Sequence, residues 1–512
     1  MERRKVRLLN PIFGGLFREE GGTKIRRCEL KDLMVRALDL ARLRGAEYAD
    51  IRVVHNRTES LVVKNGVVDA LNFDESIGFG VRLLADGAWG FASSWDLTAE
   101  EVDRQTALAL EIARASALVN NGKVNLGPAV ISQGVYQTPI QIDPSGITLD
   151  QKLDTLLRAD AEMARVPEIR VRRGNLTFIC EQKLFANTEG AFTEQTIIET
   201  GGGLQATAVG GGEVQVRSYP TSFGRQQVTA GWEMVNQWDL PGNAYRVASE
   251  AVALLKADPC PSEITTTIIL GGDQVALQVH ESCGHPTELD RVFGTEAAYA
   301  GTSFLTPEKL NTFQYSSPVV NLTADSMRPL GLGTFGWDDE GVSAQSTPLV
   351  KNGLFVGYLM SRETATQIDR VSNGCMRASG WNRIPIVRMT NVSLEPGTWR
   401  LEDLIAYTDD GVYMETNRSW SIDDKRYNFQ FGTEIGYEIK NGKLGRMLRN
   451  PTYTGITPQF WNSCDAVCGT ADWQMWGTPN CGKGQPGQVA HTGHGAAPAR
   501  FRNIRVGVLK SS

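Results

Sequence analysis

The sequence predicts an α+β fold of two domains, with mostly antiparallel sheets, flanking helices and a metal site in the C-terminal domain. Its 512 residues exceed what one ordinary hydrophobic core accommodates. Short β-prone runs are joined by Asn-Gly and Asp-Gly pairs, which favour antiparallel hairpins, and they alternate with segments of helical apolar spacing. Two of the five histidines flank one glutamate within the segment His280–His285. These features predict the fold class and place the metal chemistry late in the chain.

Residues 1–28 form a basic segment that holds eight lysines and arginines. Its apolar patch, residues 12–17, is too short for the core of a signal peptide, and no small-residue cleavage site follows it. We therefore expect a disordered, positively charged tail rather than a targeting sequence.

Over residues 29–257 the sequence predicts an N-terminal α+β domain that ends in a linker helix. A first helix is expected over residues 30–44, because its apolar residues recur at helical spacing. Thr98 is the expected N-cap of a second helix, residues 99–117. The other expected elements are strands at 49–54, 59–64, 77–84 and 88–93, a helix at 149–165, strands between 169 and 228, and the linker helix 244–256.

Residues 258–512 predict the C-terminal domain. The β-branched run 264–270 is typical of a buried strand. The helix after it is expected to be capped by Asp273 and to run through His280. Asn-Gly pairs in its later part predict further hairpins, at 351–353 and 440–442.

Composition and glycine pattern exclude several classes of function. The net charge of -6 lacks the basic excess of nucleic-acid binders, and no apolar run reaches the eighteen or so residues of a transmembrane helix. Eight cysteines scattered over a long chain indicate a reducing, cytoplasmic location. The glycine runs 201–203 and 210–212 lack the lysine of a phosphate-binding loop, so we interpret them as strand ends, bulges or close backbone approaches.

The segment from His280 to His285 carries the chemistry of a zinc peptidase. Such an enzyme needs neutral imidazole ligands and a carboxylate beside the metal, which His280, Glu281 and His285 supply. The histidines are five positions apart, and a regular α-helix rotates side chains at that spacing about 140° apart. The helix must therefore end or bulge near Gly284, which has low helix propensity, before Pro286, which disfavours α conformation at His285.

A third ligand is required, and the residues alone leave its identity open. The candidates all lie on late segments rich in glycine and turn residues: Cys464, Cys468, Cys481, His491 and His494. The spacings of 464 to 468 and of 491 to 494 also fit a closed structural zinc site built from these residues.

The sequence resembles the TldD/PmbA metallopeptidases from about residue 30 to residue 508. The segment His280–Asp290 resembles the metal helix of that family and its acidic extension. The other matching blocks are Tyr48–Arg52, Gly78–Arg82, Gly336–Gly341, Arg388–Asn391 and Cys481–Gln485. The basic first 27 residues, Cys464 and Cys468 depart from the family pattern.

The resemblance implies a two-domain α+β fold and a zinc ion held by His280, His285 and Cys481, with Glu281 as the general base. It also implies hydrolysis of peptides or unfolded polypeptide segments. The implied assembly is a homodimer, or a heterodimer with a PmbA/TldE-like paralogue that lacks the metal motif. A peptide held as an added β-strand is our hypothesis for recognition.

Several neighbouring residues keep two interpretations each. Glu288 and Asp290 are either acceptors for a ligand imidazole or surface acids. His491 and His494 either serve the active site or are loop histidines. Asp338, Asp339 and Glu340 either bind a second cation or form an acidic turn, and Cys283 is expected to be buried rather than nucleophilic. For the whole protein, the alternatives are a non-catalytic scaffold or modulator subunit and a zinc-stabilised peptide-binding module.

Overall fold

The computed structural model describes residues 16–18, 24–119 and 122–507. The expected disorder of residues 1–28 falls for the most part outside the described residues. A short hairpin, β1 (Leu16–Arg18) with β2 (Lys24–Arg26), precedes the first helix.

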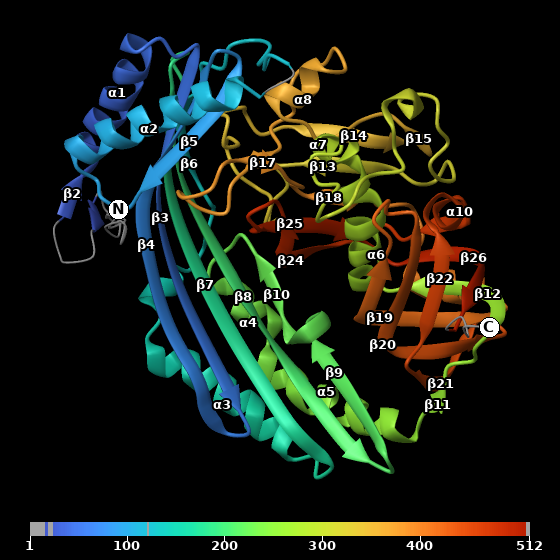
Figure 1. Ribbon diagram of the computed structural model, residues 1–512. Coiled ribbons are helices and arrows are strands. Elements are labelled where there is room, and N and C mark those ends of the chain that lie inside the picture. Colours follow the sequence, from blue (N-terminus) through green and yellow to red (C-terminus); the bar gives the residue numbers. More distant parts are fainter. Residues whose placement is uncertain (1–15, 19–23, 120–121, 508–512) are drawn as a thin grey trace, which may run out of the picture.

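A large curved sheet forms the first half of the molecule (Figure 1). Its strand order is β10-β8-β7-β3-β4-β5, and β6 and β9 both pair with β8. The bounds are β3 (Tyr48–Lys64), β4 (Val67–Ala85), β5 (Ala88–Ser94), β6 (Gln133–Gln137), β7 (Ile169–Asn187), β8 (Phe192–Gly210), β9 (Glu213–Tyr219) and β10 (Gln226–Val228). Asn65 and Gly66 both have positive φ and turn β3 into β4, as the Asn-Gly pair predicts.

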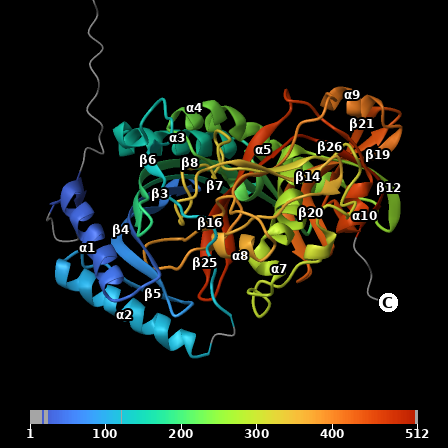
Figure 2. The ribbon, with the colours of Figure 1, turned by 90° about the horizontal axis from the view of Figure 1, so that it is seen from above.

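Each end of the long strands has its own helical layer (Figures 1 and 2). At one end, α1 (Arg27–Leu43) and α2 (Ala99–Ala117) bury residues such as Leu38 and Leu110 against β3 and β4. At the other end, α3 (Leu149–Ala164) and α5 (Leu240–Lys256) bury Leu156 and Val247 against β7 and β8. The short helix α4 (Glu233–Trp238) precedes α5.

The second large sheet closes on itself. Around the ring β20-β19-β12-β26-β22, each strand pairs with the next and β22 returns to β20. Strands β11 and β21 extend it, and β23 pairs with β26. The bounds are β11 (Asp258–Pro259), β12 (Ile264–Leu270), β19 (Asp410–Ile422), β20 (Asn428–Lys440), β21 (Lys443–Arg449), β22 (Thr452–Ile456), β23 (Cys464–Val467) and β26 (Ala499–Val506).

Smaller elements lie between and around the two large sheets. The hairpin β24 (Gln474–Lys483) and β25 (Gln488–Ala496) lies centrally, beside α6 (Gly272–Val279). The remaining strands are β13 (Leu322–Asp325), β14 (Ser346–Lys351), β15 (Leu354–Phe355), β16 (Met376–Arg377), β17 (Ile386–Val387) and β18 (Val392–Leu394). The remaining α-helices are α7 (Leu289–Val292), α8 (Arg362–Thr366), α9 (Leu401–Ala406) and α10 (Thr457–Asn462).

Buried ion pairs join the two halves. Arg217 of β9 contacts Glu415 at 2.7 Å and Glu434 at 3.3 Å, across to the second sheet. Asp339 forms an ion pair with Lys183 of β7, at a distance of 2.9 Å. A buried charge whose partner is removed is strongly destabilising, so these contacts hold the halves in one geometry around the central hairpin.

The α+β class and the antiparallel sheets are confirmed, with three local corrections. The strands expected at 49–54 and 59–64 are one continuous strand, β3. Asp273 does not cap α6, whose N-cap is Gly271, because the helix starts two residues earlier than expected. The late segment around His491 is paired strand rather than loop. The domain boundaries after residues 28 and 257 stay predictions.

Candidate metal centre

The helix carrying His280 changes its winding at the place the sequence indicates. Helix α6 passes into a π turn over His280–Gly284 and then into a 3₁₀ turn over His285–Thr287. The N–H of His285 donates to the carbonyl of His280, five residues back. This wider turn returns residues at that spacing to one side of the helix, and the two imidazole centroids lie 4.8 Å apart.

Gly284 is required in this turn because another side chain packs closely against its Cα. Its φ is -67°, which any residue adopts. A Cβ at this position would collide with the sulfur of Met389, which packs directly on the turn. Close approach therefore explains the glycine, while Pro286 sits at the start of the 3₁₀ turn, where its missing N–H costs nothing.

Three side chains meet at the end of this helix. One ligand-type atom each from His280, His285 and Cys481 lie within 4.8 Å of one another, and all three side chains are buried. Cys481 arrives on β24, and its Sγ lies 3.5 Å from Nε2 of His285. No second group of three such donors occurs in the part of the chain that the structure describes.

A histidine relay fixes the tautomer of His280. Nδ1 of His494 lies 2.9 Å from the Val392 carbonyl, which only accepts, so this nitrogen carries the proton. Burial holds the pKa of His494 well below its ordinary value, so the ring is neutral and its Nε2 accepts. Nδ1 of His280 lies 2.7 Å from that Nε2 and must donate. The lone pair of His280 is therefore on Nε2, available to a metal.

A carboxylate orients His285 in the same sense. Nδ1 of His285 lies 2.9 Å from Glu288, leaving its Nε2 toward Cys481. Burial opposes ionisation of Glu288, but Lys483 and His285 outweigh it and hold its pKa well below the ordinary range. Asp290 has no such role, because its carboxylate binds Lys483 at 2.7 Å. Of the two acids considered from sequence, only Glu288 contacts a ligand imidazole.

The protonation states suit metal ligation. Burial lowers the pKa of His280 and of His285, which favours neutral imidazoles. Burial alone would raise the pKa of the Cys481 thiol, but His285 and the buried guanidinium of Arg388 outweigh it and lower the pKa. Metal ligands must be neutral histidines and thiolates. Burial of the two imidazoles favours the first, and the charge of Arg388 beside Cys481 favours the second.

Glu281, the expected general base, forms an ion pair with an arginine. Oε2 of Glu281 accepts from Nη1 of Arg426 at 2.8 Å. Arg426 lies in the turn between β19 and β20, where its φ is 63°. Both residues line a cavity of about 320 Å³ that also reaches His280, His285 and Cys481. Sequence reasoning missed Arg426 because it lies 145 positions away, in a hairpin turn without a motif.

The other candidate ligands are directed elsewhere. Sγ of Cys464 contacts the carbonyl of Ala466 at 3.8 Å, and Cys468 packs in a different core cluster. His491 pairs with Glu199 at 2.7 Å, on the opposite face of β25 from His494. The closed structural site considered from spacing is thus not assembled among the described residues.

The acidic turn at 338–340 serves the junction between the halves instead of a second cation. Asp339 pairs with Lys183, and Glu340 accepts from Arg82 at 3.5 Å. Asp338 accepts backbone N–H groups of Glu340 and Met376. All three carboxylates are buried and already engaged, so the acidic-turn interpretation holds.

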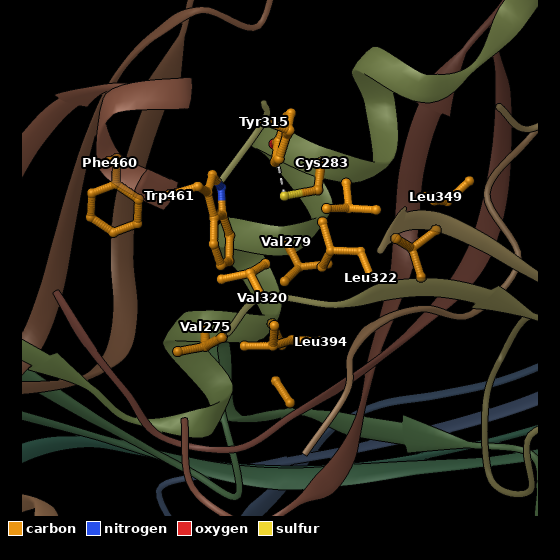
Figure 3. Close-up of a cluster of buried hydrophobic side chains, with 14 of the residues drawn as sticks. Val275, Val279, Cys283, Tyr315, Val320, Leu322, Leu349, Leu394, Phe460 and Trp461 are labelled. Carbon is orange, nitrogen blue, oxygen red and sulfur yellow. Dashed lines mark hydrogen bonds between the residues drawn. The ribbon is translucent and has the colours of Figure 1, made fainter. Parts of the chain in front are cut away.

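Cys283 lies among buried hydrophobic side chains of the core (Figure 3). Its neighbours there include Val279, Tyr315 and Trp461, and the hydroxyl of Tyr315 donates to its Sγ at 3.0 Å. Burial raises the pKa of the thiol to about 12. Cys283 is therefore a packing residue, as the sequence predicts.

The fold and cluster define a class: α+β proteins that carry two buried histidines and a cysteine as metal donors beside a glutamate. Family models of the PmbA/TldA metallopeptidases match three successive parts of the chain. Domain 1 matches residues 49–118, the central domain 142–257 and the C-terminal domain 264–508. The chain belongs to the PmbA/TldD metallopeptidase family.

Relatives of similar length carry metalloprotease names. A metalloprotease of Methanothermobacter thermautotrophicus is 29% identical, over 90% of this chain and 95% of the relative. A metalloprotease of Methanocaldococcus jannaschii is 27% identical, over 90% of this chain and 96% of its own length. A protein named metalloprotease TldD homolog from Buchnera aphidicola is 26% identical, over 92% of this chain and 95% of that protein.

Solved structures share the fold. A candidate DNA gyrase modulator of Thermotoga maritima superimposes with a TM-score of 0.74 at 18% identity, covering 93% of this chain and 99% of the other. TldE of Thermococcus kodakarensis superimposes with a TM-score of 0.71 at 15% identity, covering 94% and 100%. At these identities the likeness concerns the fold alone. Among the described residues, no helix is long and apolar enough to cross a membrane.

Proposed function

We propose that the protein is a zinc-dependent peptidase that hydrolyses peptides or unfolded polypeptide segments. His280, His285 and Cys481 are the zinc ligands, and Glu281 is the general base. The observation that carries the proposal is the meeting of these ligand atoms within 4.8 Å at the floor of a cavity that Glu281 also lines. The metalloprotease names of the full-length relatives support it.

The donor set fits zinc. Nitrogen and sulfur ligands of a tetrahedral zinc ion lie about 3.6 Å apart at the usual bond lengths. The separation of Nε2 of His285 and Sγ of Cys481 is 3.5 Å. Three protein ligands leave one position open, which is the pattern of catalytic rather than structural zinc.

The residues divide the work of hydrolysis among themselves. When bound by His280, His285 and Cys481, zinc would supply a Lewis acid for activating a water and polarising the peptide carbonyl. Glu281 takes the proton of that water and returns it to the leaving amine. Arg426 occupies Oε2 of Glu281 and so leaves Oε1 for the proton transfer. The buried, neutral histidines add no competing acid near the base.

The alternatives from sequence receive less support. A closed, zinc-stabilised binding module would have no cavity at its metal, whereas this cluster lines one of about 320 Å³. A scaffold or modulator subunit has no need of Glu281 beside the three donors. Metal content and peptide hydrolysis, measured in wild type, Glu281→Gln and Cys481→Ala, separate the three possibilities.

Assembly and location complete the proposal. We propose a homodimer or a heterodimer with a PmbA/TldE-like paralogue, without nucleic-acid or membrane partners, in the reducing cytoplasm where a thiolate ligand persists. Light scattering of the purified chain, alone and mixed with such a paralogue, tests the assembly: a monomer under both conditions would contradict it.

Replacing His494 by leucine removes the acceptor that orients His280. We expect zinc affinity to fall about 10–100-fold while the fold is retained, because outer-shell partners of ligand histidines have effects of this size. Competition with a chromophoric chelator measures the affinity. His491→Leu, three residues earlier on the other face of β25, is the matched control and should bind zinc as wild type does. Equal affinities in both variants would contradict the relay.

Replacing Arg426 by methionine frees the Glu281 carboxylate from its ion pair. We expect kcat to fall about tenfold to hundredfold, because the base loses its fixed orientation, while zinc content stays at one per chain. Arg426→Lys should recover part of the loss. The measurement is steady-state hydrolysis beside metal analysis. An unchanged kcat in Arg426→Met, at full zinc content, would show that the arginine does not position the base.

A further inference from the structure

The cavity above the metal cluster has a second wall that the hydrolysis does not use. The loop between β9 and β10 extends from the first sheet and contributes Phe223 and Arg225 to the lining. Trp420 lines the cavity from β19, in the other half of the molecule. Substrate in the cavity would therefore lie between the two halves.

Arg225 is a half-buried cation without a carboxylate. Among the described residues it forms no ion pair, and its Nη2 donates to Oδ1 of Asn480 at 3.0 Å. Burial lowers its pKa, the direction of a charge that has lost water without gaining an anion. The other arginine that lines this cavity differs, because Arg426 is paired with Glu281.

A hydrogen bond joins the guanidinium to the strand that carries Cys481. Asn480, its hydrogen-bond partner, directly precedes Cys481 on β24. Asn480 and Cys481 line one cavity together with Arg225 and the two ligand histidines. A group bound to Arg225 and a peptide bond placed at the cluster would therefore occupy the same cavity.

A pair of aromatic rings lines the cavity with this cation, and one of them contacts it. Phe223 and Trp420 are each 42% exposed, and their ring centroids lie 6.0 Å apart, edge to face. The guanidinium carbon of Arg225 lies 5.6 Å from the centroid of Phe223. Phe223 adopts a φ of 61°, which a phenylalanine rarely does, so the loop holds this ring at the cavity rather than in a core.

We infer that Arg225, Phe223 and Trp420 form a substrate subsite that binds a carboxylate of the peptide, with its apolar atoms against the two rings. The inference rests on the proposed peptidase function and extends it to the class of substrate. An arginine fork matches a carboxylate with two parallel hydrogen bonds. The carboxylate has two sources, the C-terminus of the peptide or an acidic side chain.

Equilibrium binding tests the subsite without requiring cleavage. Zinc-loaded, full-length Glu281→Gln protein is titrated with four N-terminally labelled peptides of one sequence, followed by fluorescence anisotropy. The peptides combine a free or amidated C-terminus with one internal Glu or Gln. We expect loss of the recognised carboxylate to weaken binding about tenfold, the size of a charge-assisted hydrogen bond. The pair that differs identifies the source.

Substitutions at Arg225 decide whether this residue makes the distinction. In Arg225→Met the preference should vanish, in Arg225→Lys it should persist in part, and in Arg225→Glu it should reverse toward the uncharged peptide. Arg158→Met, exposed on α3, is the control and should keep the preference. Equal binding of all four peptides, or an undiminished preference in Arg225→Met, would overturn the subsite. Because anisotropy needs no turnover, a failure to hydrolyse any peptide would count against the peptidase proposal alone.

Discussion

The Glu281→Gln protein is expected to lose peptide hydrolysis by a factor of about 10²–10⁴, the usual contribution of a general base. Glutamine has the same shape but does not take up the proton of the attacking water. Its amide still fits beside Arg426, which donates to Oε2 of the native residue at 2.8 Å. The three metal donors are untouched, so zinc content should remain one per chain.

The measurement combines kcat/KM on a labelled unstructured peptide with metal analysis of the same sample. Glu402→Gln, an exposed residue of α9, is the matched control and should retain full activity. Hydrolysis by Glu281→Gln at the wild-type rate would remove Glu281 from the mechanism and contradict its role as general base.

The Cys481→Ala protein is expected to lose both zinc and hydrolysis. The thiolate comes from β24, so its bond to zinc links the central hairpin to the end of α6. Two histidines alone make an incomplete site, and metal bound to the native state stabilises the fold by mass action. We therefore expect the zinc content of Cys481→Ala to fall below one tenth of an ion per chain. Added zinc should raise the Tm of the wild-type protein but not that of the variant.

A second cysteine separates loss of a ligand from loss of a packed side chain. Cys468→Ala removes a buried thiol from a different core cluster, so its Tm should fall through the cavity it leaves while zinc content stays at one. Full zinc content in Cys481→Ala would contradict the proposed ligand set. Loss of zinc in Cys468→Ala alone would favour the structural site considered from spacing.

Local sequence signals were sufficient for much of the fold. Turn pairs such as Asn65-Gly66 fix hairpins because both residues adopt positive φ at low cost. Thr98 caps α2 as expected, accepting from the N–H of Glu101. The sequence pattern predicts two strands in place of β3 because residues 55–58, in the middle of the strand, are all polar. The closure of the second sheet was not predictable, since it depends on pairings between strands far apart, such as β12 with β26.

The candidate site also has features that the sequence predicts and features that it does not. The bulge between His280 and His285 follows from their spacing and from the residues between them. The choice of Cys481 came from family resemblance, and the meeting of these three side chains in the structure is consistent with it. His494 and Arg426 were not predicted in their present roles, because their contacts with His280 and Glu281 span 214 and 145 residues.

X-ray absorption at the zinc edge of the zinc-loaded, full-length protein tests the ligand set most directly. The spectrum should contain one sulfur at about 2.3 Å and nitrogen or oxygen neighbours at about 2.0–2.1 Å, the signature of Cys481 with His280, His285 and one open position. A first shell without sulfur, or one with two or more sulfurs, would contradict the site.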